Sequence, residues 1–456
     1  MKKTGEEMIV KNRDELLSRG EPGLRGNLLD IIEAGIRGGD PGTGTRREVR
    51  RSGTDLWVGG HRVDLLAIDR IYVVGVGKGS FPIVQALEDI LGDRITEGVA
   101  VVKRGEERTL RRIAVHQAAH PIPDESSVEG AKKVLAIARK AGEKDLVFAA
   151  ITGGSSALAT LPPEGITLEE IQDLNDLLLK SGAVIREMNV VRKHLCGIKG
   201  GRFVSYIQPA EAVTLFLDTA PEGMPWPDLC LADPSTFAEA IEILKRYDLW
   251  EAVSGPIREY LTEGLRRPDL ETVKSLAGMK TRLVSVGDPP SMCRAAAQKA
   301  RELGFREVIL STQMEGEARE VGICHAGIAK EIIKYHRPFE PPCALVSGGE
   351  MTVTIHGACG SGGPNQEFVL GFADKFRSAD RFACASVDSD GTDGPTSIAG
   401  GIIDHIVLGE ARKSGFGFAD FLKIHNSAEA LAQLGGVIRT GHTGTNLQNL
   451  RVVLIP

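Results

Sequence analysis

The stretch that decides the fold class is Ile71-Tyr-Val-Val-Gly-Val-Gly-Lys-Gly-Ser80. Its first part is a short, mostly β-branched run, which is typical of a buried strand. Glycines and a lysine follow, and residues 82–91 then have the apolar spacing of a helix. A buried strand that runs through a glycine turn into a helix predicts an α/β fold.

The same succession recurs along the chain. Short apolar runs at residues 99–102, 146–151 and 212–218 predict further strands, and helical patterns occupy 128–141 and 167–179. This alternation predicts a mostly parallel sheet with helices on both faces. It restarts after residue 280, so the second half is expected to form another α/β domain.

Chain length also predicts two domains. The sequence has 456 residues, whereas a single hydrophobic core rarely grows beyond roughly 250–300 residues. Residues 266–280 are polar and weakly patterned. We therefore predict an N-terminal domain at 1–270 and a C-terminal domain at 271–456.

Composition narrows the function classes. The formal net charge is −6, which argues against a general nucleic-acid or anionic-membrane binder. No apolar run reaches the length of about 18 residues that a membrane span needs. None of the seven cysteines forms a Cys-x-x-Cys pair, which favours reduced thiols in a cytoplasmic protein without zinc.

Gly77 and Lys78 lie where the first predicted strand meets its helix. The motif is not a Walker A loop, and Ser80 replaces the third glycine of a dinucleotide fingerprint. An ammonium group at the start of a helix can nevertheless bridge phosphate oxygens. The alternative is a tight turn with a solvated lysine.

A second glycine turn, Gly153-Gly-Ser-Ser-Ala157, follows the predicted strand at 146–151. Its backbone amides are candidates for binding an anion. The hydrolase elbow G-x-S-x-G is not met, because position 157 is alanine. A hydrolase that uses Ser155 or Ser156 stays as an alternative.

Basic residues are concentrated between Asn189 and Arg202. On a continuous helix, Arg192, Cys196 and Lys199 would share one face. Arg192 and Lys199 can then converge on a carboxylate or a phosphate. The alternative is a solvated basic face.

An acidic turn with Asp388, Asp390 and Asp393 follows the predicted strand at 382–387, and Glu350 is a further acidic candidate. Mg²⁺ in proteins takes one or two carboxylates together with phosphate oxygens and water. One carboxylate can instead take the proton of a substrate hydroxyl. The alternative is a plain Asp-Gly turn.

Seven short motifs occur in a fixed order. They are Val74-Gly-Val-Gly-Lys78, Thr152-Gly-Gly-Ser-Ser-Ala157, Asn189-Val-Val-Arg-Lys-His194 with Lys199-Gly-Gly-Arg202, Ser347-Gly-Gly-Glu-Met-Thr-Val353, Gly362-Gly-Pro-Asn-Gln-Glu367, Asp390-Gly-Thr-Asp-Gly-Pro-Thr396 and Thr443-Gly-Thr-Asn446. As an ordered set spanning residues 24–455, they resemble the glycerate 2-kinases of the MOFRL type.

The resemblance implies a Rossmann-like N-terminal domain with a parallel sheet, a C-terminal α/β domain of the MOFRL type, and an active site in the cleft between them. It implies ATP- and Mg²⁺-dependent phosphorylation of the 2-hydroxyl of D-glycerate by a cytoplasmic enzyme. The expected partners are a small hydroxy acid and a nucleotide, with no nucleic acid and no membrane. A homodimer is a possible assembly.

The same motifs supply the predicted site residues. Lys78, Asp390 and Asp393 are the predicted catalytic residues, and the two aspartates are also the predicted Mg²⁺ ligands. Asn189, Arg192 and Lys199 are predicted to bind the acid. The predicted nucleotide- and phosphate-binding residues are Gly77, Gly153, Gly154, Ser155, Ser156, Gly348, Gly349, Glu350, Asn365, Thr445 and Asn446.

Pro364 departs from the family pattern, which usually has an arginine at this position. Proline supplies neither a charge nor a hydrogen-bond donor. Arg192, Lys193 or Lys199 would then have to neutralise the phosphoryl group. The departure keeps two alternatives open: a kinase for another short hydroxy or aldonic acid, and a non-catalytic ligand-binding relative.

Overall fold

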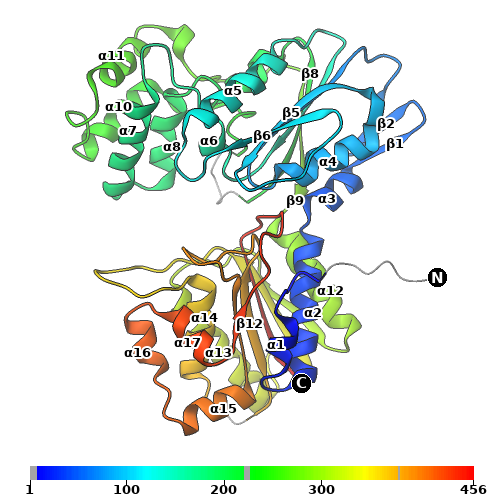
Figure 1. Ribbon diagram of the computed structural model, residues 1–456, viewed down its shortest axis with the longest axis vertical. Coiled ribbons are helices and arrows are strands. Elements are labelled where there is room, and N and C mark those ends of the chain that lie inside the picture. The colour runs from blue at the N-terminus through cyan, green and yellow to red at the C-terminus, as the bar shows by residue number, and fades with distance from the viewer. Residues whose placement is uncertain (1–7, 220–225, 378–379) are drawn as a thin grey trace. The chain divides into compact units, whose positions relative to one another are not determined.

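The computed structural model describes residues 8–219, 226–377 and 380–456, and the chain divides into two compact units (Figure 1). One comprises Pro41–Val286, and we call it the Rossmann unit. The other, which we call the mixed-sheet unit, comprises Gly287–Pro456 together with the N-terminal segment Met1–Asp40. These bounds differ from the predicted ranges 1–270 and 271–456.

The Rossmann unit is built on a six-stranded sheet in the order β6-β5-β4-β7-β8-β9. Counted along the chain from β4, this is the strand order 3-2-1-4-5-6 of the Rossmann fold. The pairs β4–β5, β4–β7, β5–β6 and β7–β8 are parallel, as predicted. The strands are β4 (Ile71–Val76), β5 (Ile95–Lys103), β6 (Ile113–Ala118), β7 (Leu146–Ile151), β8 (Glu211–Leu217) and β9 (Thr281–Gly287).

The edge strand β9 explains why this unit extends to residue 286. It lies beside β8, and the amide of Ala212 donates to the carbonyl of Lys280 at its start. The preceding polar segment also packs within the unit, since Arg202 donates to the carbonyl of Leu270. Weak periodicity therefore marked a loop rather than a domain boundary.

The helices of the Rossmann unit include a separate bundle. α7, α8, α10 and α11 bury an apolar cluster of their own, which includes Leu174, Val191 and Phe237. Thr167 caps α7, because its side chain accepts from the amide of Glu170. The helices are α3 (Pro41–Glu48), α4 (Ser80–Leu91), α5 (Glu125–Ala138), α6 (Ser155–Leu158), α7 (Leu168–Lys180), α8 (Ile185–His194), α9 (Arg202–Ile207), α10 (Phe237–Arg246) and α11 (Gly255–Gly264).

The mixed-sheet unit has a six-stranded sheet in the order β10-β11-β15-β12-β13-β14. β10 and β11 pair in parallel, and the other pairs are antiparallel. Residues 351–356 form no strand and contribute an isolated bridge between Thr352 and Glu317. The strands are β10 (Arg306–Ser311), β11 (Cys343–Gly349), β12 (Ala383–Asp388), β13 (Gly400–Asp404), β14 (Val437–Ile438) and β15 (Asn449–Ile455).

The N-terminal segment belongs to this unit because its helix α2 (Pro22–Gly38) packs along α12 (Pro289–Glu302), as Figure 1 shows. The approach is close, since a methyl group on Gly38 would lie 2.1 Å from Cβ of Ala295. Arg25 and Asp404 also form a 2.7 Å ion pair whose side chains are both fully buried. Within the described residues, no helix is long and apolar enough to cross a membrane.

Candidate active site

The two glycine turns of the Rossmann unit lie side by side at the carboxyl ends of β4 and β7. The amide of Lys78 donates to the carbonyl of Gly153 over 2.8 Å, and the amide of Gly79 donates to Oγ1 of Thr152 over 2.9 Å. The strand order reverses between these two strands, which is where open α/β sheets bind ligands. Gly77 and Lys78 therefore lie beside the second turn.

Glycine is required in both turns. Gly77 has a φ of +136°, and a methyl group there would lie 2.2 Å from Oγ1 of Thr152. Gly154 has a φ of +88°, and its methyl group would meet Cγ of Lys78 at 3.0 Å and Nε2 of His120 at 3.2 Å. The side chains of Lys78 and His120 thus lie against the second turn.

The sequence did not predict that His120 lies at this site. It follows β6, whose carboxyl end lies at the same sheet edge as those of β4 and β7. Its position after a strand of the parallel sheet was the available signal, but the run from His120 to Asp124 has the composition of a turn before a helix.

The second turn presents hydrogen-bond donors that the protein does not use. Within the described chain, the amides of Gly153, Gly154 and Ser156 have no recorded acceptor, while the next amides, of Ala157 and Leu158, donate to Gly154. The hydroxyl of Ser155 is buried and has no partner. Free amides beside an ammonium group form an anion cradle, which fits a phosphate group.

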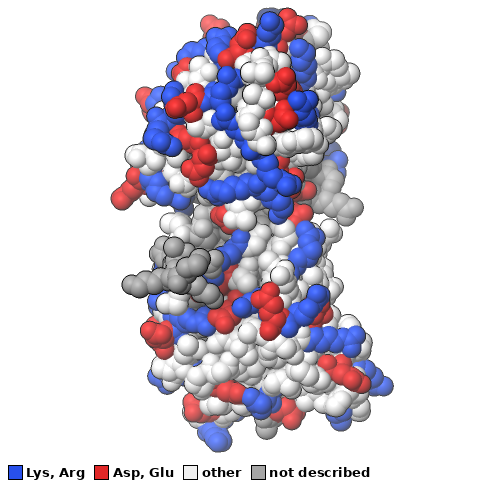
Figure 2. Space-filling view, turned by 90° about the vertical axis from the view of Figure 1, so that its right-hand side faces the viewer, with Lys and Arg blue, Asp and Glu red and all other residues white. Residues whose placement is uncertain are grey.

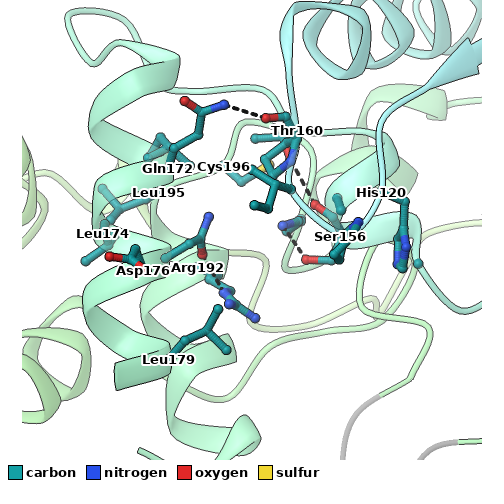
Figure 3. Close-up of a pocket in the computed structure, with 18 residues that line it drawn as sticks. His120, Ser156, Thr160, Gln172, Leu174, Asp176, Leu179, Arg192, Leu195 and Cys196 are labelled. Atoms are coloured by element: carbon teal, nitrogen blue, oxygen red, sulfur yellow. Dashed lines mark hydrogen bonds between the residues drawn. The ribbon is translucent and has the colours of Figure 1, made fainter. Parts of the chain in front are cut away.

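A cavity of about 290 Å³ adjoins this turn (Figure 3). Figure 3 shows Arg192 on the helical side of the cavity and Ser156 with His120 on the opposite side. Nζ of Lys199 donates to Oγ of Ser156 over 2.7 Å, and Nε of Arg192 donates to Oδ1 of Asn175 over 2.7 Å. The cavity therefore has two cations beside the glycine turn.

The other cavity walls are apolar. They include Ile171, Leu174, Leu179 and Leu195. Burial lowers the pKa of the Arg192 guanidinium because the cation loses hydration. A bound anion would offset this loss, so the cavity is suited to a small ligand with a negatively charged end.

Four predicted residues line this cavity, and one predicted acid-binding residue does not. The four are Gly154, Ser156, Arg192 and Lys199. Asn189 instead lines a second cavity of about 450 Å³ with Lys193 and Asp233, which form a 2.5 Å ion pair. The predicted continuous helix was wrong, because α8 ends at His194, but the turn after it returns Lys199 to the same cavity.

Acidic residues gather at the end of β12 in the mixed-sheet unit. Oδ1 of Asp388 accepts from the amide of Asp390, and Oδ2 accepts from Nδ2 of Asn449. Burial, with the nearby charges of Asp390 and Glu350, raises the pKa of Asp388 well above its ordinary value. A divalent cation would relieve this repulsion, so the cluster fits Mg²⁺.

Asp393 has a structural task that the sequence did not reveal. Its two carboxylate oxygens accept four hydrogen bonds of 2.9–3.0 Å from the backbone and side-chain amides of Asn365 and Gln366. These residues begin α14 (Pro364–Lys375), so Asp393 satisfies donors at the helix start. A methyl group on Gly363 would lie 2.4 Å from Cγ of Asp393, which explains that glycine.

The remaining predicted nucleotide-binding residues are mostly enclosed by their own unit. Asn365 is fully buried, and its Oδ1 accepts from the hydroxyl of Ser386. Gly349 allows a close approach, since a methyl group there would lie 2.2 Å from the amide nitrogen of Met314. Thr445 donates to the carbonyl of Gly39. Glu350 is exposed, while Gly348 is buried and Asn446 is half-buried.

The acidic cluster does not form a complete metal cage by itself. Within residues 8–219, 226–377 and 380–456, no three His, Cys, Asp or Glu side chains are close enough together to hold a metal ion. Mg²⁺ commonly takes one or two carboxylates and completes its shell with phosphate and water. Asp390, beside Asp388 and Glu350, is the residue that meets this description.

The fold and the two sites define a two-unit α/β protein with a Rossmann-type anion cradle in one unit and an acidic turn in the other. Residues 27–262 match a domain of unknown function (DUF4147), and residues 343–449 match the MOFRL family. The chain belongs to the family of the MOFRL-type glycerate 2-kinases, as the ordered motifs predicted.

Similar proteins support this assignment. Glycerate 2-kinase of Pyrococcus horikoshii is 40% identical, covering 94% of this chain and 96% of that protein. D-glycerate 2-kinase of Thermotoga maritima is 37% identical, covering 86% and 92%. The crystal structure of a glycerate kinase from Thermotoga maritima matches with a TM-score of 0.83 and 33% identity, covering 95% of this chain and all of that one.

One similar protein has a different name. A putative hydroxypyruvate reductase of Agrobacterium vitis is 37% identical, covering 85% of this chain and 87% of that protein. The names in the family therefore include both a phosphoryl transfer and a reduction.

Proposed function

We propose that the protein is a kinase that transfers the γ-phosphoryl group of ATP to the 2-hydroxyl of D-glycerate. The names of the relatives support this activity. The observation that carries it in this chain is the placement of Lys78 over a glycine turn with unused amides, next to a cavity that contains Arg192 and Lys199. This arrangement matches a phosphate group beside a carboxylate.

Arg192 and Lys199 bind the carboxylate of the acid in this proposal. Their charges reach the cavity from different segments, and a guanidinium can hold a carboxylate through two parallel hydrogen bonds. Neutralising the carboxylate also lowers the repulsion between the acid and the incoming phosphoryl group.

Lys78 and the amides of the second turn bind phosphate oxygens. Phosphoryl transfer asks a protein mainly to position its reactants and to balance negative charge. His120 lies against Gly154 beside Lys78 and also lines the cavity. We assign to it a hydrogen bond with the substrate hydroxyl, because a neutral imidazole can accept that proton.

Asp390 holds Mg²⁺ in this proposal, with Asp388 and Glu350 adding negative charge around it. When bound, Mg²⁺ neutralises phosphate oxygens and orients them. Asp393 keeps its place at the start of α14 and thereby fixes the turn that carries Asp390. We further propose that the enzyme works in the cytoplasm and that a homodimer is its assembly.

A coupled assay of ADP release across a panel of C3–C5 hydroxy and aldonic acids tests the proposal. We expect D-glycerate to give the highest kcat/KM, and Lys78→Ala to lower turnover by well over tenfold, about 1.4 kcal/mol or more. Lys132→Ala, an exposed lysine on α5, is the matched control. A best rate with a longer acid would show another acid kinase.

Two further outcomes of the same experiment reject kinase activity. Tight binding of nucleotide or acid without turnover of any acid would indicate a non-catalytic relative. Oxidation of NADH or NADPH with hydroxypyruvate, in place of ADP release, would indicate the reductase named for the Agrobacterium vitis protein.

A further inference from the structure

An exposed tryptophan lies on the three-stranded sheet of the Rossmann unit, which consists of β1 (Val49–Ser52), β2 (Asp55–Val58) and β3 (His61–Asp64). Trp57 is 43% exposed, whereas its neighbours Leu56 and Val58 are fully buried. The indole therefore points away from the core, where a large aromatic side chain gains little from folding.

Arginines flank Trp57 on both sides. In the antiparallel register, Trp57 pairs with Arg50 of β1 and with Arg62 of β3. All three side chains are exposed, so they lie in a row on the outer face of the sheet. Figure 2 shows many Lys and Arg side chains on this side of the Rossmann unit.

The guanidinium groups leave the indole face open. Arg62 is held by Asp55 at 2.7 Å, and Nε of Arg50 donates to the carbonyl of Arg47 over 3.1 Å. Cations stack on other aromatic rings of this protein, but within the described chain none is recorded over Trp57. Among the residues that the structure describes, none is recorded as a hydrogen-bond acceptor for the terminal nitrogens of Arg50.

A hollow of about 310 Å³ adjoins this row. It is lined by Arg47, Glu48, Arg50, Trp57 and Gly60. Gly60 adds no side chain to its floor, and the charge of Glu48 is paired with Arg47 at 2.9 Å. The hollow thus combines an open aromatic face with the guanidinium of Arg50, whose terminal N–H groups are available to bind a ligand.

We propose that this hollow is a second ligand site, which binds a mononucleotide. The base stacks on Trp57, and Arg50 with Arg47 binds the 5′-phosphate. Inorganic phosphate alone would make no stacking contact with the indole. An apolar partner would leave the guanidinium groups without acceptors. The site shares no residue with the cavity of Arg192 and Lys199, so it does not depend on the proposed kinase activity.

Titration of the full-length protein with AMP, followed by tryptophan fluorescence, tests this site. We expect AMP to quench part of the emission, and Trp57→Phe to abolish that change while leaving kinase turnover intact. Trp250→Phe is the matched control, because this indole lies elsewhere, near Lys245, and should leave the quench by AMP in place. Arg50→Gln should lower the affinity for AMP by at least about tenfold. Arg62→Gln should lower it by less than about twofold, since Arg62 is already paired with Asp55.

Other ligands define the outcomes that overturn the proposal. Equal quenching by AMP in Trp57→Phe would show that the hollow binds no nucleotide. The same conclusion would follow if Lys78→Ala abolished all binding of AMP. Binding of ribose 5-phosphate as tight as AMP would remove the role of the base. Binding of a single-stranded oligonucleotide without binding of AMP would indicate a nucleic-acid surface instead.

Discussion

Arg192 is the residue whose environment most directly indicates what the cavity binds. It is half-buried, its guanidinium has one recorded side-chain acceptor, Asn175, and burial lowers its pKa. A half-buried cation with so few acceptors is stabilised by an anionic ligand. The carboxylate of the acid is the group that we assign to it.

Arg192→Leu tests that assignment. We expect the KM for D-glycerate to rise about 10- to 100-fold with a much smaller change in kcat, since a charge-assisted hydrogen bond contributes about 1.5–3 kcal/mol. Initial rates over a range of D-glycerate concentrations measure this. Arg186→Leu, on the same helix but outside this cavity, is the control, and an unchanged KM in Arg192→Leu would refute the assignment.

At the residue scale, the sequence placed Lys78, Gly153, Gly154 and Ser156 at strand ends, and these lie together because parallel strands end at one sheet edge. It could not assign Asn189 and Arg192 to different cavities, since residues three apart on a helix lie on nearly the same face. It also missed His120, because a single histidine carries no pattern.

Asp393 and Asp390 show how one acidic turn divides its tasks at the scale of an element. Asp393→Asn replaces one acceptor oxygen with a donor that faces the amides of α14. We expect it to lower the free energy of unfolding by about 2–4 kcal/mol. Asp390→Asn should change stability by less than about 1 kcal/mol and abolish most turnover.

Urea unfolding together with steady-state rates distinguishes the two variants. The reverse result, with Asp393→Asn stable but inactive and Asp390→Asn unstable, would exchange their roles. The sequence placed both residues in one turn, but the partner of each depends on how α14 meets that turn. Such long-range contacts leave no periodic pattern in the sequence.

His325 should make the packing of α13 (Ala318–Tyr335) on β11 sensitive to pH. Its Nδ1 lies 2.8 Å from the carbonyl of Val321 and its Nε2 lies 3.0 Å from Oγ of Ser347. These contacts suit a neutral ring that donates at Nδ1 and accepts at Nε2. Burial lowers the pKa of His325 from 6.5 to about 4.

The unfolded chain binds this proton near pH 6.5, whereas the folded chain binds it only near pH 4. The free energy of unfolding should therefore fall as pH decreases through this range, by about 3 kcal/mol from this group. Denaturant unfolding at several pH values measures the slope. His325→Gln should flatten it by about one proton, and an identical slope in both proteins would contradict the shift.

The whole molecule is organised around a discontinuous unit. Residues 1–40 belong with 287–456, because α2 packs along α12 and Arg25 pairs with the fully buried Asp404. The sequence could not reveal the partner of α2, since an amphipathic helix does not specify which surface covers it. Domains that are contiguous along the chain, as predicted, therefore had the wrong boundaries.

Fragments test this organisation. We expect residues 41–286 to unfold cooperatively by circular dichroism and residues 287–456 alone to fail to fold. Loss of Arg25 leaves a buried charge unpaired at a cost of about 3–5 kcal/mol, a large part of the ~5–15 kcal/mol that stabilises a domain. Residues 1–40 joined to 287–456 by a flexible linker should fold, and a stable 287–456 fragment would refute the account.

We propose above all that Lys78 and the adjoining basic cavity serve phosphoryl transfer to D-glycerate. ³¹P NMR of the full-length protein with ATP, Mg²⁺ and D-glycerate tests it most directly. We expect equal amounts of 2-phosphoglycerate and ADP, and loss of both products in Lys78→Ala. Formation of 3-phosphoglycerate, or the same products at an unchanged rate in Lys78→Ala, would contradict it.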